Sequence, residues 1–261
     1  MTNSMKQPLT IIKVGGKIVE DPTSLAALLD GFKQIPGNKM LVHGGGRTAT
    51  QVALRLGYET KMIDGRRVTD ADMLWVVTMV YGGLVNKNIV AQLNSRGVCA
   101  LGMTGADCGV IISHKRKATP VDYGFVGDVD KVDSSRLASI INQGITPVFA
   151  PLTFDVHGNL LNTNADTIAG ETAKAMAHIY DVSLVYCFEK RGVLSNPDDD
   201  NSVIAEIHAP DFPKLVGDGV VSGGMIPKIQ NALQAVEAGV KRVIITAAKG
   251  LDIEGGTKIL P

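Results

Sequence analysis

Apolar runs of strand length alternate along this sequence with segments of helical periodicity, and this alternation constrains the fold more than any other feature. Thr10–Val14, Met40–Val42 and Ser183–Phe188 have the length and composition of buried strands. Asp21, followed by a proline, can cap and open a helix soon after the first run. Strands that alternate with helices predict a mainly parallel sheet with helices on both faces. The expected fold class is therefore α/β, a three-layer αβα sandwich.

Glycines cluster where several of these runs end. Gly15 and Gly16 follow the first run, and Gly44, Gly45 and Gly46 follow the second. Ligands bind beyond the carboxyl ends of the strands in such folds, and glycine lets the backbone come close to a ligand. These clusters are therefore the first candidates for a ligand site.

The composition fits a soluble globular protein of one domain or two closely joined lobes. The chain has 261 residues, and its 26 basic residues balance its 26 acidic ones. This balance leaves no basic surplus for nucleic acid or anionic lipid, so neither nucleic acid nor a membrane is expected as a partner. The start of the chain has no signal-peptide pattern, and no apolar stretch approaches the ~20 residues of a membrane span. Cys99 and Cys187 lie in apolar runs and predict buried free thiols in a reducing compartment, so the expected location is cytoplasmic.

Lys13 lies inside the first apolar run, two residues before the glycine pair. A lysine is costly to bury unless its charge meets a partner. A phosphate, approached by the backbone N–H groups of Gly15 and Gly16, is one such partner. The alternative is an edge-strand lysine that points to solvent.

The run His43-Gly44-Gly45-Gly46 leads into a helix and can form an anion cradle of backbone donors. The same motif occurs in lipase oxyanion holes. The sequence has no G-x-S-x-G motif, no G-x-x-x-x-G-K-[ST] loop and no G-x-G-x-x-G after the first run, which argues against hydrolases, P-loop enzymes and nicotinamide dehydrogenases. His43 itself is expected to be structural.

Arg66 and Arg67 stand shortly before a helical segment. Arginine offers a fork of donors suited to a carboxylate, and a solvated turn is the alternative interpretation. Thr69 and Asp72 have capping-box spacing, so the helix is expected to begin here and to run to about Asn94.

Two later segments carry further polar groups. Asn162 and Asn164 offer amide donors and acceptors, and Asp166 is a candidate cap for the helix that follows. Gly224 precedes a helix with Lys228 in its first turns, which suits a second phosphate contact, although a lone lysine is more often a surface residue.

These segments, in their order, resemble the amino-acid kinase family: Lys-x-Gly-Gly, His-Gly-Gly-Gly, Arg-Val-Thr, Asn-x-Asn-Ala-Asp and Gly-Met-x-x-Lys. The resemblance runs from about Thr10 to Leu260, and within the family it is to the branch that phosphorylates N-acetyl-L-glutamate. Carbamate, aspartate and uridylate kinases share the lysine and glycine features but differ in the third and fourth segments. The resemblance implies the amino-acid kinase fold and ATP-dependent phosphorylation of the side-chain carboxylate of an N-acylglutamate, the second step of arginine biosynthesis.

The resemblance also implies roles for residues of this chain. Lys13 and Lys228 would flank the transferred phosphoryl group, and Asp166 would orient both lysines. The nucleophile is a carboxylate, ionised at neutral pH, so no general base is required. Mg²⁺ would be held mainly by the ATP phosphates, with no metal site made by the protein. The implied substrate-binding residues are Gly45, Gly46, Arg67 (on the α-carboxylate), Asn162 and Asn164, and the implied ATP-phosphate contacts are Gly15, Gly16, Gly44 and Gly224.

The sequence departs from the family pattern at two places. Glu189 stands where relatives often carry an aspartate, which leaves the adenine contacts open. Arg66 stands where relatives commonly have a leucine-like residue, and a second cation would suit an acyl group that ends in a carboxylate. N-succinyl-L-glutamate is therefore the alternative substrate, unless Arg66 points to solvent.

The resemblance implies a single domain over residues 1–261, with an acceptor lobe over about 1–180 and an ATP lobe over about 181–261. It further implies a homodimer with its interface in the first lobe. Only about nine residues precede the first strand, which leaves no room for the extra helix associated with arginine feedback, so insensitivity to arginine is expected. Two other hypotheses stay open: another kinase of this fold, such as an aminoadipate-type or carbamate kinase, and a non-catalytic nucleotide or amino-acid sensor.

Overall fold

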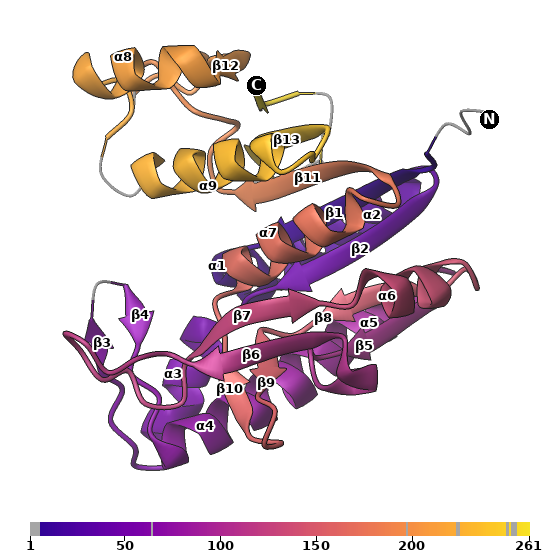
Figure 1. Ribbon diagram of the computed structural model, residues 1–261, viewed down its shortest axis with the longest axis vertical. Helices are drawn as coiled ribbons and strands as arrows, with labels where there is room; N and C mark the ends of the chain where they lie inside the picture. Colours follow the sequence, from indigo (N-terminus) through magenta and orange to yellow (C-terminus); the bar gives the residue numbers. More distant parts are fainter. Residues whose placement is uncertain (1–5, 64, 197, 223–224, 249–250, 252–254) are drawn as a thin grey trace.

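The computed structural model describes residues 6–261 except 64, 197, 223–224, 249–250 and 252–254. Its centre is a sheet with the strand order β12-β14-β13-β11-β1-β2-β8-β5 (Figure 1). All neighbouring pairs in this sheet are parallel except β13 with β14. The predicted mainly parallel sheet is therefore confirmed. Its strands are β1 (Pro8–Val14), β2 (Asn38–His43), β5 (Ala100–Met103), β8 (Thr146–Phe149), β11 (Asp181–Phe188), β12 (Glu206–His208), β13 (Arg242–Ala247) and β14 (Thr257–Leu260).

Strand β1 shows why the strands of this sheet have continuous apolar runs in the sequence. All of its residues after Pro8 are buried. Successive side chains point to opposite faces, so Ile11 packs into one apolar cluster and Ile12 into the other. A strand covered on both faces needs apolar side chains at every position rather than at alternate ones.

Helices cover both faces of the sheet and complete the three layers. Side chains of α6, α7 and α9 pack into the cluster that contains Ile11, and those of α2, α4 and α5 pack into the cluster that contains Ile12. The helical elements are α1 (Gly16–Glu20), α2 (Pro22–Gln34), α3 (Gly46–Arg55), α4 (Ala71–Val77), the π-helix η1 (Thr78–Val85), α5 (Asn86–Ser95), η2 (Asp107–Gly109), α6 (Ser134–Ile141), α7 (Ala165–Met176), η3 (Ala209–Asp211), α8 (Phe212–Gly217) and α9 (Met225–Glu237).

The helical stretch from Ala71 to Ser95 differs from the prediction at its start. Asp70 is the cap, because its carboxylate accepts from Met73 N at 2.8 Å. Thr69 is buried and donates its hydroxyl hydrogen to Arg67 O, so the predicted capping box is wrong. The regular α-helix is interrupted around Gly82 and Gly83 by the π-helical segment η1.

The same stretch is long and apolar enough, by length and composition alone, to be considered as a membrane span. In this fold, however, its apolar side of Met73, Val77, Val80 and Ile89 is buried in the core. Packing against the central sheet therefore accounts for its hydropathy.

A second, smaller sheet was not predicted. It has the order β10-β9-β6-β7, so the strand that follows Val110 pairs outside the central sheet. Its strands are short and β7 carries charged residues at alternate positions, which resembles a loop in sequence. The strands are β6 (Ile111–Lys115), β7 (Gly127–Val132), β9 (Leu152–Phe154) and β10 (Leu160–Asn162), and a separate hairpin pairs β3 (Met62–Ile63) with β4 (Arg66–Arg67).

Candidate active site

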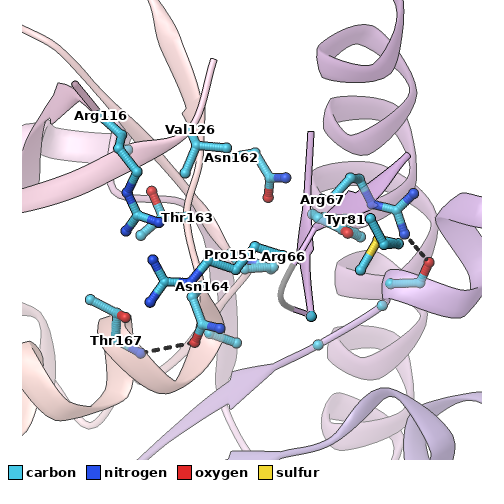
Figure 2. A pocket seen from close by; sticks show the side chains of 17 residues that line it. Arg66, Arg67, Tyr81, Arg116, Val126, Pro151, Asn162, Thr163, Asn164 and Thr167 are labelled. Carbon is cyan, nitrogen blue, oxygen red and sulfur yellow. Dashed lines mark hydrogen bonds between the residues drawn. The ribbon is translucent and has the colours of Figure 1, made fainter. Parts of the chain in front are cut away.

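Two cavities lie beyond the carboxyl ends of the central strands. The first, called here the arginine pocket, has a volume of about 220 Å³ and is lined by Arg66, Arg67 and Arg116 with Gly44, Gly45 and Gly46 (Figure 2). The second, called the lysine pocket, has a volume of about 330 Å³ and is lined by Lys17, Lys190 and Lys228 with Gly15 and Gly16. The two predicted glycine clusters therefore line two different cavities.

The two glycine clusters touch and form the wall between the pockets. Gly44 N donates to Val14 O at 3.0 Å, directly beside the loop that contains Gly16. A Cβ atom on Gly44 would lie 3.2 Å from Gly16 N, and one on Gly45 would lie 3.0 Å from the Tyr81 ring. A side chain at Gly44 would push the two glycine clusters apart, and one at Gly45 would press on Tyr81 of η1. Gly44 lines the arginine pocket, and its predicted phosphate contact stays a prediction.

Lys13 is buried in β1, and its Nζ lies 2.7 Å from Oδ1 of Asp166. Asp166 stands in the first turn of α7, whose cap is Asn164: the Asn164 side chain accepts from Asp166 N at 2.7 Å and from Thr167 N at 3.2 Å. The predicted helix-cap role of Asp166 is therefore wrong. Its carboxylate turns to Lys13 instead, and the buried charge has the partner that it requires.

Lys228 approaches the same group from α9. Its Nζ lies 4.0 Å from the centroid of the Phe188 ring, and Lys13 Nζ lies 5.7 Å from that centroid. Both ammonium groups are therefore within cation–π distance of the same ring. Burial lowers the pKa of Lys228, and the nearby charge of Lys13 adds to this effect against the opposing attraction of Asp166. The fold thus brings together Lys13, Asp166 and Lys228 from three distant segments, as the motif order predicted.

Lys17 and Glu189 face each other across the mouth of the lysine pocket. Lys17 Nζ lies 2.5 Å from Oε1 of Glu189, and both side chains are about half exposed. Lys17 comes from α1 and Glu189 directly follows β11. The sequence drew attention to Glu189 but gave no reason to select Lys17, since a lysine after a glycine pair is ordinary for a surface helix.

Arg67 is buried beside the arginine pocket and is held by the protein itself. Its Nη2 donates to Gly46 O at 2.7 Å and to Thr50 Oγ1 at 2.8 Å, and its Nη1 donates to Thr60 Oγ1 at 3.2 Å. These bonds tie β4 to the start of α3. Binding of a substrate α-carboxylate by Arg67 stays a prediction.

The remaining predicted acceptor residues also line the arginine pocket. Asn162 donates to Thr69 Oγ1 at 2.9 Å, which leaves its amide oxygen for a ligand, and Asn164 lines the pocket beside it. Arg66 is exposed on the protein surface yet contributes to the same lining (Figure 2). Arg116, which follows β6, was missed because His114 to Lys117 forms a charged run typical of a solvated surface.

His43 supports the wall between the pockets. It is fully buried, its Nδ1 lies 2.8 Å from Gly44 O, and Asn86 Nδ2 donates toward its Nε2 at 3.1 Å. Burial lowers the pKa of His43 to about 4, so the ring is neutral at pH 7 and donates from Nδ1. These contacts agree with the structural role expected for His43.

Two further predictions concern Gly224 and the binding of a metal ion. Gly224 lies outside the described part of the chain, so its predicted phosphate contact has no structural account. Within the described residues, no group of three or more His, Cys, Asp or Glu side chains is placed to hold a metal ion. Asp166 and Glu189 are each paired with a lysine, so a Mg²⁺ ion here would take most of its oxygen ligands from a nucleotide.

Comparisons with known proteins, by sequence and by fold, agree on one family for this chain. The amino acid kinase family matches residues 8–247. The acetylglutamate kinase of Bacteroides fragilis is 60% identical over 259 residues, covering 99% of both chains. That of Bacteroides thetaiotaomicron is 61% identical over 255 residues, covering 98% of this chain and 99% of its own length. The crystal structure of smu.665 from Streptococcus mutans is 29% identical, has a TM-score of 0.77 and covers 97% of this chain and 98% of its own.

Proposed function

Because this chain belongs to the amino acid kinase family, we propose that it is an ATP-dependent phosphotransferase with a carboxyl group as acceptor. It phosphorylates the side-chain carboxylate of N-acetyl-L-glutamate and releases N-acetyl-L-glutamyl 5-phosphate and ADP, the second step of arginine biosynthesis. Relatives of about 60% identity over nearly the whole chain carry this name, and they favour the acetyl substrate over the succinyl alternative.

The observation that carries the proposal is the position of Lys13, Asp166 and Lys228 with respect to the two pockets. Lys228 lines the lysine pocket, while the neighbours of Asp166 in the chain, Ala165 and Thr167, line the arginine pocket. We assign ATP to the lysine pocket and the acylglutamate to the arginine pocket. The reacting carboxylate and the γ-phosphoryl group would then meet beside the two lysines.

The chemistry required of these residues is electrostatic. A side-chain carboxylate oxygen attacks the γ-phosphorus as the bond to the β-phosphate oxygen breaks, and negative charge spreads over the equatorial phosphoryl oxygens. Lys13 and Lys228 oppose that charge, and Asp166 keeps Lys13 in place. The carboxylate nucleophile is already ionised, so no general base is needed. Mg²⁺, which the nucleotide phosphates would hold, supplies further charge neutralisation when bound.

The finer assignments belong to the same proposal. Residues 1–180 form the acceptor lobe and residues 181–261 the ATP lobe, and the chain works in the cytoplasm as a homodimer that arginine does not inhibit. The family resemblance supports these statements. Light scattering that gives the mass of a monomer would contradict the homodimer. Inhibition by low concentrations of arginine would contradict the expected insensitivity to arginine.

The decisive experiment is ATP-dependent formation of an acyl phosphate, trapped with hydroxylamine, with N-acetyl- and N-succinyl-L-glutamate compared at matched concentrations. We expect turnover with the acetyl substrate. Preference for the succinyl substrate would replace the acetyl assignment. Failure with every acylated glutamate, despite nucleotide binding, would support the sensor hypothesis instead.

A further inference from the structure

Arg116 lies in the arginine pocket and has no part in the reaction described above. It directly follows β6, and its backbone N–H donates to Val126 O at 2.8 Å. Its side chain forms a two-pronged contact with Asp128 of β7: Nε donates to Oδ2 at 3.0 Å, and Nη2 donates to Oδ1. Two parallel bonds to one carboxylate fix the plane of the guanidinium group. The orientation of Arg116 is therefore set before any ligand binds.

The third nitrogen of this guanidinium group has no partner. Nη1 of Arg116 is shielded from solvent and makes no hydrogen bond to any described residue. A buried donor without an acceptor is costly, and more so when it belongs to a charged group. Because Arg116 lines the arginine pocket, its unpaired donor indicates a position where a ligand supplies the missing acceptor.

A second guanidinium group stands nearby. Arg66 reaches the same pocket from β4, whereas Arg116 comes from the smaller sheet, and Figure 2 shows both turned into the pocket. The hydrogen bond from Arg116 lowers the pKa of Asp128, and the charge of Arg66 acts in the same direction. The ionised Asp128 therefore offsets one of the two positive charges and leaves the other for a ligand.

The lining of the arginine pocket carries three arginines and, among its described residues, no carboxylate. Arg67 is already engaged, because both of its terminal nitrogens donate to protein acceptors. Among the three arginines, the terminal nitrogens that make no hydrogen bond to a described residue are Nη1 of Arg116 and those of Arg66. Guanidinium groups select carboxylates through their planar fork of donors.

We propose that Arg116, oriented by Asp128, is a substrate-binding residue that donates from Nη1 to a carboxylate of the acceptor, beside Arg66. This inference rests on the proposed function, since it concerns the acceptor of that reaction. The side-chain carboxylate of an acylglutamate has to reach Lys13 and Lys228. The carboxylate that Arg116 binds is therefore a second one, either the α-carboxylate or a carboxylate on the acyl group.

The test is steady-state kinetics of Arg116→Gln with three acceptors: N-acetyl-L-glutamate, its α-carboxamide and N-succinyl-L-glutamate. We expect KM for the acceptor to rise about ten- to hundred-fold, with KM for ATP unchanged. If the partner is the α-carboxylate, the wild-type preference for the acid over the α-carboxamide shrinks in the variant. If the partner is an acyl carboxylate, the loss is confined to the succinyl substrate.

Two further variants separate binding from folding. Asp128→Asn keeps the Arg116 charge but loosens its orientation, so it should raise KM for the acceptor by a smaller factor than Arg116→Gln. Arg96→Gln is the matched control, because the Arg96 side chain is also 20% exposed and pairs with Asp30, but it lines neither pocket. If wild type and Arg116→Gln had equal KM values for all three acceptors, as expected of Arg96→Gln, the inference would be overturned. A wild-type protein that forms no acyl phosphate would instead overturn the proposed function.

Discussion

The two pockets hold their positive charges in different ways. In the lysine pocket, Lys17 is paired with an acidic side chain and Lys228 lies over an aromatic ring. In the arginine pocket, Arg67 is fixed by neutral acceptors and Arg116 by Asp128, while the side chain of Arg66 makes no hydrogen bond to a described residue. A lysine ammonium is a compact point charge that can move between partners, whereas an arginine fork recognises a planar carboxylate. The difference teaches that the two pockets differ in cation type, and under the proposed function this separates the phosphoryl side of the site from the acceptor side.

The largest expected effect tests the lysine side of this comparison. Lys13→Met removes a charge that, in the proposed reaction, faces the transferred group, and kcat should fall by about 10²–10³-fold, the usual cost of losing one such group. KM for the acceptor should change little, because the arginine pocket is untouched. Lys241→Met is the control, since Lys241 makes an exposed ion pair with Asp181 away from both pockets. A variant that raised KM for the acceptor but kept kcat would show that the two pockets do not divide the work in this way.

The second effect concerns the wall that the pockets share. The pKa of buried His43 is lowered to about 4, whereas an unfolded histidine titrates near 6.5. The unfolded chain therefore binds an extra proton between these values, and stability should decrease as pH falls from 6.5 to 4, by about 3 kcal/mol. Urea unfolding at pH 7 and pH 4.5 measures the change. His43→Gln should flatten this pH dependence, and an unchanged slope in that variant would assign the effect to other groups.

The sequence predicted the parts of the site that long buried strands create. Lys13 lies near the end of a continuous apolar run and the glycine clusters follow such runs, so their place at the carboxyl ends of parallel strands could be inferred. Lys228 was recognised only through the family resemblance, because a lysine in a helix is common on any surface. Apolar runs in the sequence therefore predicted more of the residues near the lysine pocket than of those that line the arginine pocket.

The parts that the sequence missed depend on contacts between short polar segments. Arg116 meets Asp128 across a hairpin of charged, partly exposed strands that have no apolar run to mark them. The two caps were displaced by one or two positions, to Asp70 and Asn164, because several short polar residues stand together there and only the backbone path decides between them. Cys99 was expected to be buried but is exposed, because it precedes β5, an edge strand of which only the last residue is buried.

The third prediction concerns pH on the lysine side. Burial lowers the pKa of Lys228 below its ordinary value of 10.5. Since only the charged form opposes the phosphoryl charge, kcat should decline at alkaline pH below 10.5. The folded chain gains in stability over the same range, because the unfolded lysine binds its proton more tightly. Lys228→Arg keeps its charge to higher pH, so its alkaline decline should move upward. An identical profile in both proteins would assign the decline to another group.

The smallest effect is expected from the ion pair between Lys17 and Glu189. An exposed pair contributes about 0–1 kcal/mol, so Lys17 can exchange Glu189 for a nucleotide phosphate at low cost. Lys17→Gln should therefore weaken ADP binding about threefold to tenfold at low salt, and less at high salt. Glu189→Gln should not weaken ADP binding, because it frees Lys17 for the phosphates.

Calorimetry with ADP and with adenosine distinguishes this exchange from a purely structural clamp. Adenosine has no phosphate, so its affinity should be the same in wild type and Lys17→Gln. Lys241→Gln, which removes the exposed pair with Asp181, should leave both affinities unchanged. If Lys17→Gln weakened adenosine as much as ADP, the pair would act by holding the pocket's shape. The lysine side would then resemble the arginine side, where Asp128 fixes a cation in place.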